Sequence, residues 1–216
     1  MNEVMSLNVG KPREVDWEGG EVTTGIFKQP VSGRVALRTT NLDGDGQADL
    51  SVHGGIHKAV YAYSLAHYDF WKRELARGDL RPGQFGENFS VEGWTDDAVH
   101  IGDIFRVGTA LVEVSQPRTP CFKLGLRMGD AKFPKRFLAS GRPGFYLRVL
   151  EEGEVGAGDA MERVHMGPEQ MSVQEVSRLL HFERGDRARV ERVLAIPALS
   201  PEWRRPFEEA LAKSGG

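Results

Sequence analysis

Short apolar runs, separated by glycine and proline, dominate the first three quarters of the chain. Between Met5 and about Val164 these runs are rich in β-branched and aromatic residues, which is typical of the strands of a β-sandwich or β-barrel. The runs that predict strands are 22–27, 33–39, 59–63, 85–91, 104–115 and 144–150. Helical spacing interrupts them twice, in a helix capped by Ser64 and closed by Gly78 and in a shorter one over 133–138.

The pattern becomes helical in the last quarter of the chain. Ser172-Val173-Gln174-Glu175 is a capping box that predicts the start of a helix, Asp186 caps a second helix, and Ser200-Pro201 opens a third. We therefore expect a mainly β domain over residues 1–166, with a few peripheral helices, and a small three-helix domain over residues 167–216. The apolar stripes of these helices are short, which indicates an accessory element that packs on the β domain or on a partner.

Composition excludes several classes of protein. The 216 residues carry 28 basic and 31 acidic side chains, and the net charge of -3 gives no general attraction to nucleic acid or anionic lipid. A single cysteine excludes an internal disulfide, a Cys-x-x-Cys redox pair and an iron–sulfur cluster held by the chain's own thiolates. The first ten residues lack a secretory signal, and no apolar run approaches about 18 residues. We expect a cytoplasmic protein whose partners include neither a membrane nor nucleic acid.

The single cysteine, Cys121, lies in a segment with two prolines and an apolar lead-in over 110–114. This pattern predicts a strand that stops abruptly and presents the thiol on a rigid turn. Arg118 and Lys123 flank the cysteine, and nearby positive charge favours the thiolate, which attacks electrophiles and binds soft metals. A small buried apolar side chain is the alternative role for a lone cysteine.

A glycine turn, His53-Gly54-Gly55-Ile56-His57-Lys58, is the second candidate segment. Consecutive glycines let the backbone approach a ligand and offer unobstructed N–H groups to an anion, and Lys58 adds a positive charge. His53 and His57 have the spacing of a helical zinc pair, but the two glycines disfavour a helix and no third ligand is evident. A structural turn with a solvated lysine remains the alternative.

Further polar residues belong to two short segments. Asn88, within Phe85-Gly86-Glu87-Asn88-Phe89, could bind the edge of a heterocycle or satisfy backbone groups at a strand entry. Arg118 offers a bidentate fork suited to phosphate, and Gln116 and Thr119 lie on the same turn.

Two common binding motifs, a calcium loop and a glycine-rich phosphate loop, are not supported by the sequence. Residues 41–46 imitate the start of a calcium loop, but Val52 stands where the bidentate glutamate belongs, so a tight turn of Asp and Gly is expected. No glycine-rich phosphate loop is present, which leaves nicotinamide or ATP chemistry without local support.

Taken in this order, the glycine–lysine, Asn88 and cysteine segments resemble the MOSC domain family, named for the C-terminus of molybdenum cofactor sulfurases. The likeness is strongest to its YiiM-type members, in which three helices follow the MOSC domain. The chain differs from the family pattern Gly-Gly-x-Asp-Lys at one position, because His57 stands where the pattern has an acidic residue. The resemblance implies a MOSC-type β-barrel and a pterin-based molybdenum cofactor (molybdopterin with molybdenum), with the thiolate of Cys121 on the metal. The residues that it assigns to cofactor binding are His53, Gly54, Gly55, Lys58, Asn88, Gln116, Arg118 and Thr119.

The resemblance also implies an activity. YiiM-type proteins are associated with the reduction of N-hydroxylated compounds, such as 6-N-hydroxylaminopurine and related base analogues, to amines, and so with detoxification of base analogues. A separate flavin or iron–sulfur reductase would then supply the electrons. The alternative is a carrier that uses the same cysteine to deliver the cofactor or sulfur to other proteins.

Two further questions concern the partners of the chain. DNA binding through the C-terminal helices has little electrostatic support, because residues 172–216 contain eight basic and seven acidic residues, a net charge of only +1. The oligomeric state stays open, with a homodimer as one alternative.

Overall fold

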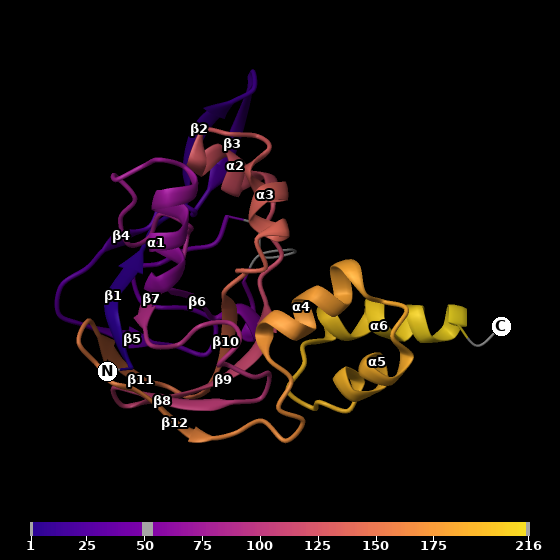
Figure 1. The fold of residues 1–216 in the computed structure, drawn as a ribbon. Coiled ribbons are helices and arrows are strands. Elements are labelled where there is room, and N and C mark those ends of the chain that lie inside the picture. Colours follow the sequence, from indigo (N-terminus) through magenta and orange to yellow (C-terminus); the bar gives the residue numbers. More distant parts are fainter. Residues whose placement is uncertain (1, 49–53, 215–216) are drawn as a thin grey trace.

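The structure, a computed structural model, describes residues 2–48 and 54–214 of the chain (Figure 1). Over these residues the strands are β1 Glu3–Val9, β2 Arg13–Trp17, β3 Gly20–Thr24, β4 Gln29–Pro30, β5 Arg34–Leu37, β6 Val60–Ser64, β7 Phe89–Glu92, β8 Ile104–Val107, β9 Ala110–Pro117, β10 Phe145–Glu151, β11 Gly153–Gly156 and β12 Met161–His165. The helices are α1 Leu65–Glu74, α2 Phe122–Met128, α3 Phe133–Ala139, α4 Val173–Phe182, α5 Arg187–Leu194 and α6 Pro201–Ser214, with a short 3-10 helix, η1, at Ile56–Lys58. The mainly β fold expected from the sequence is confirmed. Among the helices of the described ranges, none combines the length and the apolar character needed to cross a membrane.

A large mixed sheet forms the body of the molecule. Its order over the described residues is β12-β8-β9-β10-β6-β7-β1-β4. Neighbouring strands are antiparallel except β6 and β7, which run parallel with α1 crossing between them. The order has two ends, so the closed barrel that we expected is not confirmed; Glu3 and Ala160 form only an isolated bridge near those edges.

Turns divide two of the predicted strands. The predicted strand 104–115 is a hairpin of β8 and β9, because Gly108 takes a φ of 56° that glycine adopts without strain. The predicted strand 85–91 begins only at Phe89, since residues 82–85 form turns and Gly86 N donates to the carbonyl oxygen of Gly83 at 3.1 Å.

The helices of the β domain are partly as predicted. The helix at 133–138 is confirmed as α3, but α1 ends at Glu74 rather than near Gly78, because Ala76 takes a left-handed φ of 50°. Helix α2, which begins directly after Cys121, was not predicted. Its glycine content weakens the helical signal, although Gly129 ends the helix in the left-handed conformation typical of a C-terminal cap.

The three C-terminal helices begin where the sequence predicts. Ser172 Oγ accepts a hydrogen bond from Glu175 N at 3.1 Å, and Glu175 Oε2 accepts one from Ser172 N at 2.9 Å, which confirms the capping box. Asp186 caps α5 by accepting from Arg189 N at 3.1 Å, and α6 begins at Pro201.

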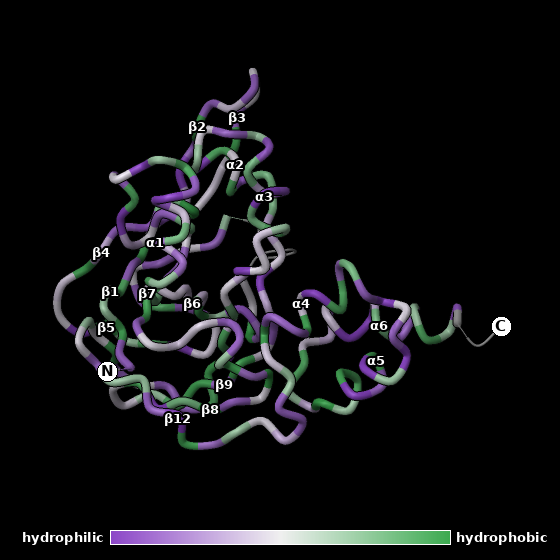
Figure 2. Tube along the Cα trace, viewed as in Figure 1, coloured by the Kyte–Doolittle hydropathy of each residue, from purple (hydrophilic) through white to green (hydrophobic). Residues whose placement is uncertain are grey.

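These helices share one hydrophobic core with the sheet. Figure 2 shows hydrophobic stretches (green) along β8 and β9 and in α5, and Figure 1 places α4–α6 beside the β9 region of the sheet. Buried members of this cluster from both parts of the chain include Phe105, Val112, Val114, Val173, Val176, Leu179, Val190, Val193, Trp203 and Phe207. The helices therefore pack on the β domain, while the domain boundary between residues 166 and 167 stays a prediction.

A second, aromatic cluster lies beneath the site described below. Trp71 stacks on Phe137 with ring centroids 5.9 Å apart, and its Nε1 donates to the hydroxyl of Tyr63 at 2.8 Å. Phe85 packs against Tyr63 at 4.8 Å, and Tyr61 belongs to the same buried group. Close packing of large rings restricts their rotamers, so this cluster gives the site a rigid floor.

We predict that Trp203→Ala destabilises the protein by about 3–5 kcal/mol, because it empties a space in the core that both parts of the chain share. Urea denaturation followed by circular dichroism measures the change. Phe182→Ala is the matched control in the same helical domain, since this side chain is 61% exposed and should shift stability little. Equal effects of the two substitutions would contradict the shared core.

Candidate functional site

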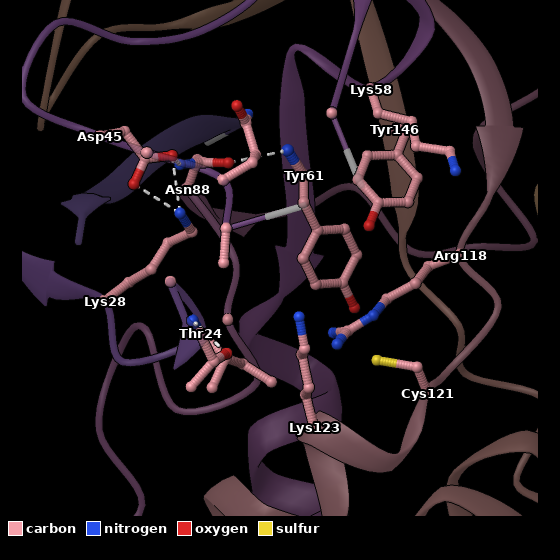
Figure 3. A pocket seen from close by; sticks show the side chains of 17 residues that line it. Thr24, Lys28, Asp45, Lys58, Tyr61, Asn88, Arg118, Cys121, Lys123 and Tyr146 are labelled. Carbon is pink, nitrogen blue, oxygen red and sulfur yellow. Dashed lines mark hydrogen bonds and ion pairs between the residues drawn. The ribbon is translucent and has the colours of Figure 1, made fainter. Parts of the chain in front are cut away.

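A pocket opens where the cysteine segment, the glycine–lysine segment and two N-terminal turns meet (Figure 3). The side chains that define its chemistry are Lys28, Lys58, Tyr61, Arg118, Cys121 and Lys123. The cavity volume is about 90 Å³. Ligand pockets usually measure about 300–1,000 Å³, so this cavity has room for only one end of a large ligand.

Cys121 lies at the N-terminal end of α2, three residues beyond Arg118. Its φ of -114° and ψ of 173° are extended, and Leu124 N donates to its carbonyl oxygen at 3.0 Å, which closes the first turn of the helix. Leu124 is fully buried and anchors that turn. The strand β9 ends at Pro117, so the predicted abrupt stop is confirmed. In Figure 3 the partly buried thiol points toward the guanidinium of Arg118.

Arg118 is the most deeply buried cation of the pocket, with 6% of its surface exposed. Its Nη1 donates to the carbonyl oxygen of Phe85, and its guanidinium lies 4.5 Å from the ring centroid of Tyr61. Burial by itself lowers the pKa of Arg118, but the neighbouring Tyr61, Tyr146 and Cys121 raise it, and the net pKa is above its ordinary value. Arg118 therefore stays charged in a place that water hardly reaches.

The glycine turn leads into η1 and presents Lys58. Gly54 and Gly55 have φ values of 96° and 82°, which other residues adopt only with strain. No described atom lies within 4 Å of a Cβ added at Gly55, whereas one added at Gly54 would approach Gln47 Cδ at 2.9 Å. Lys58 lines the pocket and pairs with the carboxylate of Glu202 in α6. His53 lies outside the described residues.

Lys28 and Asp45 form a buried ion pair on the opposite wall. Lys28 Nζ lies 2.6 Å from Asp45 Oδ2, and the two side chains are 8% and 1% exposed. Burial lowers the pKa of Lys28, and Asp45 opposes this effect. Asp45 also accepts from Gly10 N at 2.7 Å, so its carboxylate is satisfied within the protein. The tight turn expected around residues 41–46 is confirmed, with Asp45 N donating to the carbonyl oxygen of Leu42.

Asn88 lines the pocket, but its amide is used by the protein itself. Its Nδ2 donates to Asn8 O at 3.2 Å and to Asp45 Oδ2 at 2.9 Å, and its Oδ1 accepts from Tyr61 N at 3.1 Å. The geometry therefore favours the second of the two roles considered above, satisfaction of backbone groups where β7 begins.

Gln116 and Thr119 lie on the cysteine segment but do not line the pocket. Gln116 is 1% exposed on β9, and its Oε1 has no hydrogen-bond partner among the described residues. Thr119 is exposed. A role of either residue in binding a cofactor stays a prediction.

Sequence reasoning missed several residues of the pocket. Tyr61 was given no role, Lys123 was expected only to favour the thiolate of Cys121, and Asp45 was assigned only to a turn. Lys28 had no local signal, since its partner Asp45 is 17 positions away. Burial raises the pKa of Tyr61 and also that of Tyr146, so both phenols keep their protons and act as neutral hydrogen-bonding groups.

The pocket thus combines a soft sulfur donor with an excess of positive charge. Figure 3 shows the charged ends of Arg118 and Lys123 beside the thiol, while the other two cations that line the pocket, Lys28 and Lys58, pair with the carboxylates of Asp45 and Glu202. Such a set suits a ligand with an anionic group, and the thiolate form of cysteine suits a soft metal. Over the described residues, no group of three or more His, Cys, Asp or Glu side chains is arranged to hold a metal ion.

Comparison with family models gives two matches along the chain. Residues 49–162 match the model of the MOSC domain, and residues 171–213 match the model of the YiiM-like, 3-alpha helix domain.

Curated relatives match much of the chain. Protein YflK of Bacillus subtilis is 44% identical over 204 residues, covering 94% of this chain and 92% of the relative. Protein YiiM of Escherichia coli is 35% identical over 189 residues, covering 86% and 84%. A protein of Gibberella moniliformis named Reductase is 39% identical over 165 residues, which cover 75% of this chain but 29% of that protein.

Solved structures agree with these matches. The crystal structure of YiiM from Geobacillus stearothermophilus has a TM-score of 0.83 at 36% identity and covers 98% of this chain and 100% of its own. That of YiiM from Escherichia coli has a TM-score of 0.78 at 28% identity, covering 99% and 94%.

The buried ion pair predicts a stability effect. Asp45→Asn should destabilise the protein by about 3 kcal/mol, because it leaves the buried ammonium of Lys28 without a countercharge. Asp43→Asn is the control, since Asp43 lies two positions away in the same turn, is 55% exposed and pairs only at the surface with Arg38. Chemical denaturation of both variants measures the difference. A loss below 1 kcal/mol in Asp45→Asn would show that the pair contributes little.

Proposed function

Because the chain belongs to the MOSC domain family, we propose that it is a molybdenum-cofactor-dependent reductase that converts N-hydroxylated compounds to amines. The observation that carries this proposal is the convergence of Cys121, Arg118, Lys123 and Lys58 on one pocket. The pocket holds the combination that the cofactor requires, a soft donor for a metal and positive charge for a phosphate.

The chemistry of the donor set fits a metal that arrives with ligands of its own. Cys121 can contribute one soft ligand, and a metal already held by dithiolene sulfurs matches it in softness. Arg118 and Lys123 lie on the same side of the pocket as the thiol, and Figure 3 shows their charged ends directed toward one another. Two such cations repel each other, so an anionic ligand between them stabilises the arrangement.

The cations, the glycine backbone and a partly buried tyrosine of the pocket each suit one part of such a ligand. Arg118 would hold the phosphate of the cofactor with a permanent, nearly dehydrated charge, and Lys58 and Lys123 would add two further positive charges. The backbone at Gly55 gives a ligand close access. Tyr146 retains its proton because burial raises its pKa, so its hydroxyl can donate a hydrogen bond to a bound molecule.

When bound, the molybdenum cofactor supplies a two-electron reduction that removes the oxygen of an N–OH group and leaves the amine and water. We propose hydroxylaminopurine-type base analogues as substrates and their detoxification as the role of the protein. The Gibberella relative named Reductase supports a reductive activity. Only 29% of that relative matches this chain, which is compatible with electron delivery by a separate flavin or iron–sulfur unit.

Loss of the thiol should remove the metal. In Cys121→Ser a hard, mostly protonated hydroxyl replaces the soft ligand, so molybdenum per chain should fall at least about tenfold in protein produced with cofactor synthesis intact. Elemental analysis measures the metal, and fluorescence of the oxidised pterin measures the organic part. Phe122→Ala, at an adjacent exposed position that does not line the pocket, should retain both. Full molybdenum in Cys121→Ser would exclude the cysteine as its ligand.

The source of electrons gives a second prediction. NADH alone should not support reduction of an N-hydroxylated purine by the cofactor-loaded protein, because the chain has no dinucleotide fingerprint and no second redox centre built from cysteines. A reduced one-electron dye, or NADH with a flavin or iron–sulfur reductase, should restore turnover. Rapid turnover with NADH alone would contradict the partner requirement. No turnover with dye at full molybdenum loading would favour the carrier function.

A further inference from the structure

An ion pair joins the pocket to the C-terminal helices. Lys58, whose side chain is 11% exposed, pairs with Glu202 in the first turn of α6. The carboxylate of Glu202 is far more accessible, with 55% of its side chain exposed. A basic residue of the site is thus in contact with an acidic residue from the accessory part of the chain.

One residue of β9 positions both partners. The carbonyl oxygen of Ser115 accepts from Ser200 N at 3.1 Å, which fixes the start of α6 two positions before Glu202. The hydroxyl of Ser115 donates to His57 O at 2.6 Å, directly before Lys58, and lies 3.1 Å from Tyr146 O. The backbones on either side of the ion pair are therefore held in place, while the carboxylate itself can move.

The position of Glu202 makes it a competitor of anionic ligands. The charge of Glu202 acts on the pocket, because it raises the pKa of Tyr146. Burial, Arg118 and Cys121 have larger effects on the same pKa. An ion pair with one half-exposed partner is weak, because solvent screens it, so a ligand of higher charge can displace the carboxylate. A negative charge in the first turn of α6 is also stabilised by the helix dipole after it leaves Lys58.

We infer that the carboxylate of Glu202 competes with anionic ligands for Lys58. It pairs with Lys58 in the absence of ligand and must be displaced when an anion binds. The C-terminal domain thereby sets the affinity of the pocket for phosphate groups. This inference rests on the proposed function in one respect, that Lys58 belongs to an anion-binding site.

Titration of the full-length protein with inorganic phosphate at low ionic strength tests the inference, followed by NMR shifts of backbone amides. Glu202→Gln should bind phosphate about threefold to fivefold more tightly, since exposed ion pairs of this kind change equilibria by such factors. Glu208→Gln removes the same charge from an exposed position of α6 and should bind like the wild type. In the background of Lys58→Met, which should bind phosphate more weakly, Glu202→Gln should have no effect.

The outcomes separate the two claims. If Lys58→Met weakens phosphate binding but Glu202→Gln leaves it unchanged, the anion site stands and the role of Glu202 is wrong. Weaker binding in Glu202→Gln would show that the carboxylate orients Lys58 rather than competing for it, and would also overturn the inference. If phosphate binds in the pocket of neither the wild type nor any variant, both the anion site and the inference fail.

Discussion

The burial of the Arg118 guanidinium is the interaction on which the pocket depends. A permanent charge can leave water only where fixed dipoles and aromatic faces replace the lost hydration. Here the carbonyl oxygen of Phe85 and the ring of Tyr61 fulfil that need. These groups come from the turn before β7 and from β6, while Arg118 itself follows β9. One side chain therefore fixes three segments that are distant in the sequence, and the thiol of Cys121 takes its position from the same arrangement.

Much of the fold could be predicted from local patterns. The caps at Ser172 and Asp186 and the proline at Pro201 mark helix starts through contacts within a few residues, and the structure confirms all three. The order of strands depends on contacts between distant segments, which periodicity does not report. For the same reason the sequence did not reveal that the C-terminal helices share a core with β9, and the expected closure of the barrel is not confirmed.

The site was predictable to the extent that its chemistry is local. Cys121, Arg118 and Lys58 each lie in a segment whose composition suggests binding, and the structure brings all three to one pocket. Lys28 and Glu202 could not be found in this way, because each is linked to the site by an ion pair with a residue far along the chain. Thr119 was assigned with them from its place in the sequence alone; its side chain is exposed and does not line the pocket, and its role stays a prediction.

The protein is a scaffold that places the thiol of Cys121 beside a group of cations, so the position of the metal is the most direct test of the proposed function. Anomalous diffraction at the molybdenum edge, from crystals of the cofactor-loaded protein, measures that position without reference to activity. We expect one strong peak in the pocket next to Cys121 Sγ, with the phosphate of the cofactor among Arg118, Lys123 and Lys58. A peak outside this pocket, or a metal in the pocket without contact to Cys121, would contradict it.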